Sequence, residues 1–177
     1  MEIPTRFEQA VDLSTPLLRL FVYGSLKGGY DNYNRYCRGV RSIERTWIEG
    51  QLFQVPTGYP VLRLTESCYL ARGTEDLSSD IALLQQFTES PPGRFLSRTR
   101  GRQGVVHGEL LTFANPAARL KAIDGLEEFH AGRKSRYERV LIRVYSPIRQ
   151  AEVPAWTYVA GDLSARGRLI PTGNWTS

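Results

Sequence analysis

Short apolar runs separated by glycine and proline dominate this sequence, and they predict mainly β-strands. The first run, Leu18–Tyr23, is apolar except for Arg19, which is typical of a strand buried on both faces. Alternating apolar and polar positions predict further strands over 46–55, 61–64, 105–113, 137–145 and 151–159. Gly50 interrupts the 46–55 strand, and we expect a bulge or a close approach of another segment there.

Few segments have helical spacing. One helix is predicted with Asn115 as its N-cap, Pro116 in its first turn and its end near Leu126. Shorter helices are predicted over 32–38 and 80–88, the second with Asp80 as its N-cap. Because strands outnumber helices, the pattern favours an α+β fold. We expect a small mixed β-barrel with a few short helices, since closure removes exposed strand edges.

Length and local composition suggest the domain organisation. The 177 residues suit one domain that spans 1–177. Residues 1–17 are expected to be a loosely attached lead-in. The Pro-, Gly- and Arg-rich residues from about 89 to 104 predict a surface loop, either mobile or a lid over a pocket. The apolar tail at 169–175 is expected to pack back onto the domain.

Overall composition argues against several classes of protein. Apolar residues make up 41% and charged residues 23% of the chain, as in ordinary globular proteins. No stretch approaches the roughly 20 apolar residues of a membrane span, and the start has no signal-peptide pattern. We therefore expect a cytoplasmic protein without a membrane partner. Cys37 and Cys68 lack metal-ligand spacing, and two thiols are favoured over a single disulfide.

The net charge of +5 is carried mostly by arginine, part of it clustered in 94–102 and 133–139. Such clusters can bind nucleic acid, but none of the common nucleic-acid-binding motifs accompanies them. A solvated basic surface, or a mild preference for acidic small molecules, is therefore favoured. No nucleic-acid partner is expected.

The glycine-rich break after the first predicted strand is one candidate for chemistry. The residues GSLKGG at 24–29 have neither the GKS or GKT of a P-loop nor the GxGxxG spacing of a dinucleotide site. Two interpretations stay open on this pattern. The break is a plain turn, or it is a cradle whose backbone N–H groups hold an anion.

Acidic residues at the end of the 115–126 helix are a second candidate. Asp124, Glu127 and Glu128 oppose the helix dipole, so helix stability does not explain them. Glu127 is next to the apolar stripe of the helix, whereas Glu128 is expected to point towards water. A half-buried carboxylate has a raised pKa, which suits a general base. The alternative is a solvated glutamate or one paired with Arg136 or Arg139.

Five short motifs in a fixed order resemble the gamma-glutamylcyclotransferase-like superfamily, and within it the gamma-glutamylamine cyclotransferase branch. They are FVYGSLKGGYDNY (21–33), IEGQLFQVPTGYPVL (48–62), VHGELLTF (106–113), AIDGLEEF followed by SRYERVLIRV (122–144), and IPTGNW (170–175). The segment 65–103 has no clear counterpart. The resemblance implies the mixed β-barrel of this family and an enzyme that cyclises a γ-glutamyl group to 5-oxoproline, releasing an amine.

In that family the YGSL-type loop binds substrate, and the glutamate of the LDxxE motif is the general acid and base. The resemblance therefore assigns substrate binding to Tyr23, Gly24, Ser25 and Leu26, and catalysis to Glu127. A loop of this kind would be a cradle for the α-carboxylate of the γ-glutamyl group.

The partner implied by the resemblance is a small-molecule γ-glutamyl compound, and neither a cofactor nor a metal is implied. Glu128 stands where many members carry Gly or Ser, which changes the local charge. A module that binds a small metabolite without turnover is the alternative on the same fold. The sequence indicates neither the amine that is released nor an oligomeric state.

Overall fold

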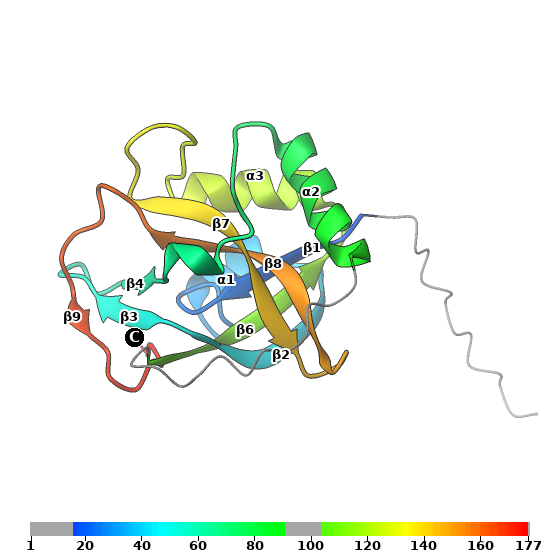
Figure 1. The fold of residues 1–177 in the computed structure, drawn as a ribbon. Coiled ribbons are helices and arrows are strands. Elements are labelled where there is room, and N and C mark those ends of the chain that lie inside the picture. The colour runs from blue at the N-terminus through cyan, green and yellow to red at the C-terminus, as the bar shows by residue number, and fades with distance from the viewer. Residues whose placement is uncertain (1–15, 91–103, 177) are drawn as a thin grey trace, which may run out of the picture.

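The computed structural model describes residues 16–90 and 104–176, and Figure 1 shows the path of the chain. Nine strands and three α-helices follow in these ranges, with one 3₁₀ helix. They are β1 (Leu18–Val22), α1 (Asp31–Tyr36), β2 (Val40–Glu49), β3 (Gln51–Gln54), β4 (Pro60–Arg63), η1 (Glu66–Cys68), β5 (Ala71–Arg72), α2 (Leu77–Glu89), β6 (Val105–Phe113), α3 (Pro116–Leu126), β7 (Tyr137–Ser146), β8 (Ala151–Ala160) and β9 (Arg168–Leu169). The predicted α+β class is confirmed.

Six strands form one mixed sheet in the order β2-β6-β1-β8-β7-β5, in which only β1 and β8 are parallel. The sheet curls so that β2 approaches β7, and side chains join the two strands. The Thr46 hydroxyl donates to the Tyr145 carbonyl at 2.8 Å, and the Glu44 carboxylate accepts from the Ser146 hydroxyl at 2.5 Å. The described strands are therefore barrel-like, without a continuous backbone ladder that closes the barrel.

A smaller sheet, ordered β4-β3-β9, packs beside the large one. Gly50 separates β2 from β3, so the predicted strand over 46–55 is in fact two strands in different sheets. A Cβ at Gly50 would lie 2.6 Å from Leu64 Cδ2 and 3.2 Å from the Arg63 carbonyl oxygen. The close approach expected at this glycine is present, and it explains why the strand changes sheets there.

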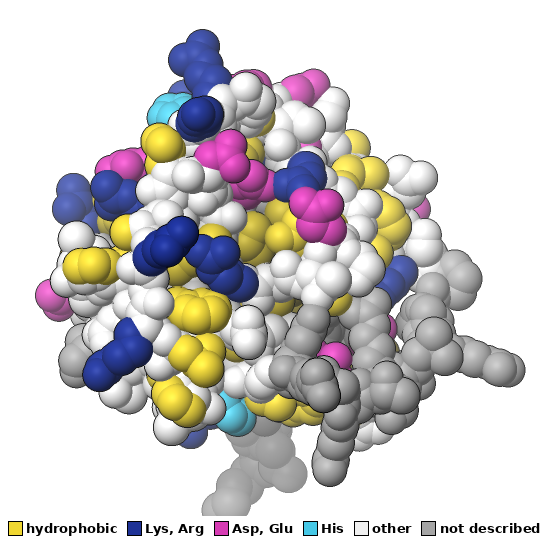
Figure 2. All heavy atoms as spheres, turned by 60° about the vertical axis from the view of Figure 1, so that its left-hand side comes forward, with side chains coloured by type: hydrophobic (Ala, Val, Ile, Leu, Met, Phe, Trp, Pro, Cys, Tyr) yellow, Lys and Arg dark blue, Asp and Glu magenta, His cyan; other side chains and the backbone are white. Residues whose placement is uncertain are grey.

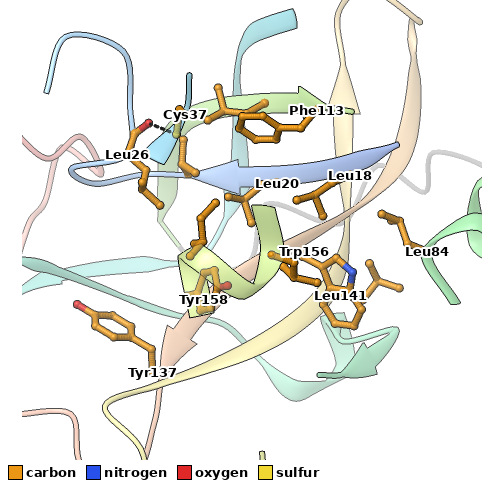
Figure 3. Close-up of a cluster of buried hydrophobic side chains, with 14 of the residues drawn as sticks. Leu18, Leu20, Leu26, Cys37, Leu84, Phe113, Tyr137, Leu141, Trp156 and Tyr158 are labelled. Atoms are coloured by element: carbon orange, nitrogen blue, oxygen red, sulfur yellow. Dashed lines mark hydrogen bonds between the residues drawn. The ribbon is translucent and has the colours of Figure 1, made fainter. Parts of the chain in front are cut away.

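β1 is a central strand with side chains buried on both faces of the large sheet, as its apolar run predicts. One apolar cluster lies between this sheet and helices α2 and α3, and Figure 3 shows Leu18, Leu20 and Trp156 within it. A second cluster includes Phe21 and Trp175. Because Trp175 is only 5% exposed, the C-terminal tail packs back onto the fold as predicted.

α2 begins earlier than the sequence pattern indicated. Asp76 is the N-cap, and its carboxylate accepts hydrogen bonds from the N–H groups of Ser78 and Ser79 at 3.0 and 3.1 Å. Asp80, which was predicted to be this cap, is buried and pairs with Arg139 of β7. That prediction was wrong because two aspartates four residues apart both fit the cap pattern.

The third helix has the predicted bounds, with Asn115 at the N-cap in a left-handed conformation (φ 57°). Of the predicted lead-in over 1–17, residues 1–15 lie outside the described residues. Of the predicted surface loop over 89–104, Glu89 ends α2 and residues 91–103 lie outside the described residues. Across 16–90 and 104–176, no helix combines the length and hydropathy needed to cross a bilayer.

Candidate active site

A cavity of about 400 Å³ opens beside the ends of β1 and α3. It brings together all the residues to which the sequence assigns binding or catalysis. The face in Figure 2 is the left-hand side of Figure 1, and it shows hydrophobic side chains in a hollow with acidic and basic groups nearby. The residues that line the cavity are Phe21, Val22, Tyr23, Gly24, Ser25, Leu26, Asn32, Val55, Thr57, Tyr59, Pro60, Val61, Leu126, Glu127, Arg136, Tyr137, Tyr158, Leu163 and Ala165.

The glycine-rich loop enters the cavity wall as a tight turn. The Lys27 N–H donates to the Gly24 carbonyl at 3.0 Å, so Ser25 and Leu26 occupy the two central positions of the turn. Backbone N–H groups at these positions have no partner inside such a turn. Within the described part of the chain, neither of the two N–H groups donates a hydrogen bond. Two donors are thus available next to the cavity.

Contacts behind the turn fix its position. The Ser25 carbonyl accepts from the Tyr33 N–H at 3.2 Å, and the Ser25 hydroxyl accepts from the Asn32 amide at 2.8 Å. The buried Lys27 ammonium donates to the Trp175 carbonyl at 2.8 Å, which ties the turn to the C-terminal tail. The donors of the turn are therefore held in place before any ligand arrives.

Gly24 is required by the close packing of the turn against β4. A Cβ at this position would lie 2.8 Å from Cγ of Pro60, closer than real Cβ contacts. The proline ring has little freedom to move away. Glycine therefore lets the turn pack against Pro60 of β4, and both residues line the cavity.

Glu127 is the C-cap residue of α3, and its backbone N–H donates to the Ile123 carbonyl at 2.9 Å. Burial, and then the nearby Asp124 charge, raise its pKa from 4.5 to about 7. Glu128 has a left-handed conformation (φ 53°) and an exposed side chain with Arg136 at 3.7 Å. The two neighbouring glutamates therefore have different environments, as the sequence pattern predicted.

Behind Glu127, a buried ion-pair network holds the end of α3 against the sheet. The fully buried Arg139 guanidinium donates to the carboxylates of Asp124 and Asp80 and to the Thr74 carbonyl at 3.0 Å. The other Asp124 oxygen accepts from the Tyr158 hydroxyl at 2.6 Å. The ion pairs of Arg136 and Arg139 thus go to acidic residues other than Glu127.

Four tyrosines line the cavity, and the hydroxyl groups of three of them, Tyr23, Tyr137 and Tyr158, donate to acceptors of the protein itself. Tyr23 donates to the Tyr158 carbonyl at 2.8 Å, and Tyr137 donates to the Pro60 carbonyl at 3.0 Å. Burial raises the pKa of Tyr23, Tyr137 and Tyr158 well above the usual value. These side chains are neutral near pH 7, so they shape the cavity and do not supply a titrating proton there.

The sequence analysis assigned no role to Tyr137 or Tyr158, and it named Arg136 only as a possible ion-pair partner of the glutamate. Tyr137 and Arg136 stand in the SRYERV motif, which is the signal that could have drawn attention to them. Tyr158 lies inside an apolar strand and carries no comparable signal. Within 16–90 and 104–176, no group of three His, Cys, Asp or Glu side chains is arranged to hold a metal ion.

The fold agrees with the results of comparison with known proteins. The model of the AIG2-like gamma-glutamyl cyclotransferase family matches residues 20–87 and 78–177, so the chain belongs to this family. A search of functionally curated proteins gave no match.

Solved structures from several kingdoms share the fold. An uncharacterised protein of Pyrococcus horikoshii is 16% identical, with a TM-score of 0.51 over 89% of each chain. YkqA of Bacillus subtilis is 15% identical, with a TM-score of 0.52 over 90% of this chain and 39% of its own. A protein of Arabidopsis thaliana is 20% identical, with a TM-score of 0.50 over 86% of this chain and 74% of its own.

Proposed function

We propose that this protein is a gamma-glutamylcyclotransferase that converts a γ-glutamyl group to 5-oxoproline and releases an amine. The observation that carries the proposal is the place of Glu127. A carboxyl group with a pKa of about 7 lines the same cavity as a turn with two available N–H donors. A pKa near the working pH is what a group needs to accept a proton and return it in one reaction.

The turn at 24–27 would bind the α-carboxylate of the substrate through the N–H groups of Ser25 and Leu26. Charge-assisted hydrogen bonds to a carboxylate are stronger than neutral ones, and these two donors are held by the contacts behind the turn. The ring of Tyr23 would form one wall beside the bound group. Fixing the carboxylate orients the α-amine, which must reach the γ-carbonyl carbon of the same molecule.

In the reaction, the α-amine nitrogen attacks the γ-carbonyl carbon and closes a five-membered ring. Glu127 takes a proton from the α-ammonium group and donates it to the nitrogen of the leaving amine as the original amide bond breaks. The new ring nitrogen loses a second proton as it becomes the lactam N–H, and the released amine ends as an ammonium ion, so the protons balance and no cosubstrate is consumed. Most of the rate gain would come from the folded pose of the substrate, because both reacting groups belong to one molecule.

The chain is proposed to work as one catalytic domain. The two family matches together span 20–177, and residues from both matched segments line the cavity described above, which supports this view. We also propose that the enzyme acts in the cytoplasm. Cys37 and Cys68 are thiols in the structure, a form that a reducing compartment preserves.

The test is release of 5-oxoproline by the purified protein, residues 1–177, from a panel of γ-glutamyl compounds. Glu127→Gln should keep the fold and the affinity for a γ-glutamyl compound, yet lose about 10²- to 10⁴-fold in turnover. Glu128→Gln is the matched control and should cost far less, because that side chain is exposed. Wild-type protein that binds γ-glutamyl compounds without releasing 5-oxoproline would instead support the metabolite-binding module.

A further inference from the structure

A second cavity, of about 490 Å³, opens next to the glycine-rich loop and shares no described lining residue with the candidate active site. Four segments that are far apart in the sequence contribute to it: the loop within 27–30, the strands β2 and β6, and the C-terminal tail within 172–174. Neither the substrate binding nor the proton transfer proposed above uses this cavity. Its ligand must therefore be argued from its own side chains.

Hydrogen bonds between these segments fix the cavity walls. The Gly28 N–H donates to Oε2 of Glu109 at 2.8 Å, which holds the loop against β6. The His107 N–H donates to the Gly173 carbonyl at 2.8 Å, which holds the tail beside the start of β6 (Figure 1). The Lys27 ammonium donates to acceptors of the tail and so joins the loop to it. The cavity is thus formed before any ligand arrives, as small-molecule sites usually are.

Three charged side chains line the cavity, and none of them forms an ion pair with a residue of 16–90 or 104–176. They are Lys27, Arg45 and Glu109. Lys27 is only 8% exposed, and burial lowers its pKa. A buried ammonium group normally has a negative partner, because removing a charge from water is costly. The cavity therefore holds charge that a ligand can compensate.

Arg45 of β2 lies directly opposite Glu109 of β6 in the antiparallel register. Side chains in such positions start about 5 Å apart at Cβ, and opposite charges there stabilise a sheet by pairing. No ion pair joins these two, and the carboxylate instead contacts the Gly28 N–H through one oxygen. The Arg45 guanidinium and the other carboxylate oxygen make no hydrogen bond within the described part of the chain. A cation and a carboxylate thus line one cavity side by side, each with free hydrogen-bonding capacity.

The two signs of charge restrict the ligand. A simple anion is attracted by Lys27 and Arg45 but repelled by Glu109, and a simple amine meets the reverse. A molecule with a carboxylate and an ammonium group close together can form a charge-assisted hydrogen bond with each sign. Free α-amino acids have this arrangement, because both groups are attached to one carbon atom.

We infer that this cavity is a second binding site, for a small zwitterion of the α-amino acid class. The ligand carboxylate contacts Arg45, and its ammonium group contacts Glu109. Lys27 adds positive potential on the side of the carboxylate. The site is separate from the candidate active site and does not depend on the proposed function.

The test follows the backbone amide chemical shifts of the protein, residues 1–177, during titration with L-alanine, propanoate and ethylamine. Propanoate lacks the ammonium group of alanine, and ethylamine lacks the carboxylate. L-Alanine should shift the amides of Gly28 and Gly108 saturably, with a Kd about tenfold or more below that of either analogue. Arg45→Gln and Glu109→Gln should each raise this Kd about tenfold. Arg41→Gln changes another exposed arginine of β2, outside the cavity, and as the matched control should keep it.

Several outcomes would overturn the inference. One is an equal Kd for L-alanine and either analogue, because the site would then not recognise both charges. Another is a wild-type Kd in Arg45→Gln, a variant of an exposed side chain that is expected to fold. Shifts confined to the amides of Ser25 and Leu26 would place the amino acid in the candidate active site instead. So would the lack of saturable shifts at Gly28 and Gly108 with L-alanine and with a panel of the standard amino acids count against it. None of these measurements uses turnover, so failure here leaves the cyclotransferase proposal standing, and failure to release 5-oxoproline leaves this inference standing.

Discussion

The environment of Glu127 predicts a cost in stability that can be measured without knowing the substrate. The folded protein raises the pKa of this carboxyl from 4.5 to about 7, mainly by burial. Well below pH 4.5 the carboxyl is protonated in both the folded and the unfolded chain, so its ionisation does not change the free energy of unfolding. As the pH rises, the unfolded chain releases the proton first, so ionisation favours unfolding until the folded pKa is passed.

The size of this effect follows from the difference between the two pKa values. At 1.36 kcal/mol per pKa unit, the ionisable Glu127 costs the folded protein up to about 3 kcal/mol above pH 7. Glu127→Gln removes the titrating group while keeping its size. The variant should therefore match the wild type in unfolding free energy near pH 4 and exceed it by up to about 3 kcal/mol at pH 8, if both glutamine and glutamic acid meet the same neighbours.

Urea unfolding of the two proteins at several pH values gives the required numbers, because the difference between them cancels the titration of all other groups. Glu128→Gln is the control and should follow the wild type, since its side chain is 61% exposed. If the wild type and Glu127→Gln keep a constant difference from pH 4 to pH 8, Glu127 is not desolvated, and the basis for its role as a proton acceptor near neutral pH is lost.

Three further substitutions test other parts of the site. Glu128→Gly should stabilise the protein by about 1 kcal/mol without loss of activity, because the φ of 53° at this position strains any residue other than glycine. Thermal unfolding measures this effect, and an unchanged or lower midpoint would contradict it. Gly24→Ala should lower kcat/KM more than 10-fold, since the new Cβ would meet the Pro60 ring at 2.8 Å; a kcat/KM equal to wild type would contradict the packing argument. Asp124→Asn should destabilise the fold by about 3 kcal/mol or more, since it breaks a buried ion pair. It should also move the acidic limb of the pH–activity profile to lower pH, because the charge that helps to raise the pKa of Glu127 is gone; a limb that stays in place would assign that pKa to burial alone.

Local patterns predicted the elements well where one signal dominated. The Asn115-Pro116 pair marked the start of α3 correctly, because few other residues there could begin a helix. Asp80 misled because its burial depends on Arg139, 59 residues away, which no local pattern contains. Gly50 was recognised as a point of close approach, but the segment that approaches it, β4, decides that the strand changes sheets there.

The candidate site was less accessible to sequence reasoning than the fold. The resemblance to a family pointed to the turn and to Glu127, whereas the residue pattern alone left open a plain turn and a solvated or arginine-paired glutamate. The contact between Tyr23 and Tyr158 could not be found from the sequence. The Tyr23 hydroxyl donates to the backbone carbonyl of Tyr158 across 135 residues. Tyr158 belongs to β8 and Tyr23 directly follows β1, and the apolar character of both segments is already explained by burial.

The acidic end of α3 shows why the two parts of the AIDGLEEF and SRYERV motif belong together. Three carboxylates at a helix C-terminus are unfavourable, because they face the negative end of the helix dipole. In the structure, each of the three carboxyl groups has a different environment. Asp124 is neutralised by the buried Arg139, so the second half of the motif supplies the charge that the first half needs. Glu128 points outwards to solvent, near Arg136. Glu127 keeps its proton up to about pH 7, and this leaves one carboxyl in the cavity that can exchange a proton there. The ion pair that holds α3 against β7 therefore also fixes the residue one turn further along, and the position of the proposed catalytic group depends on an arginine that never reaches the cavity.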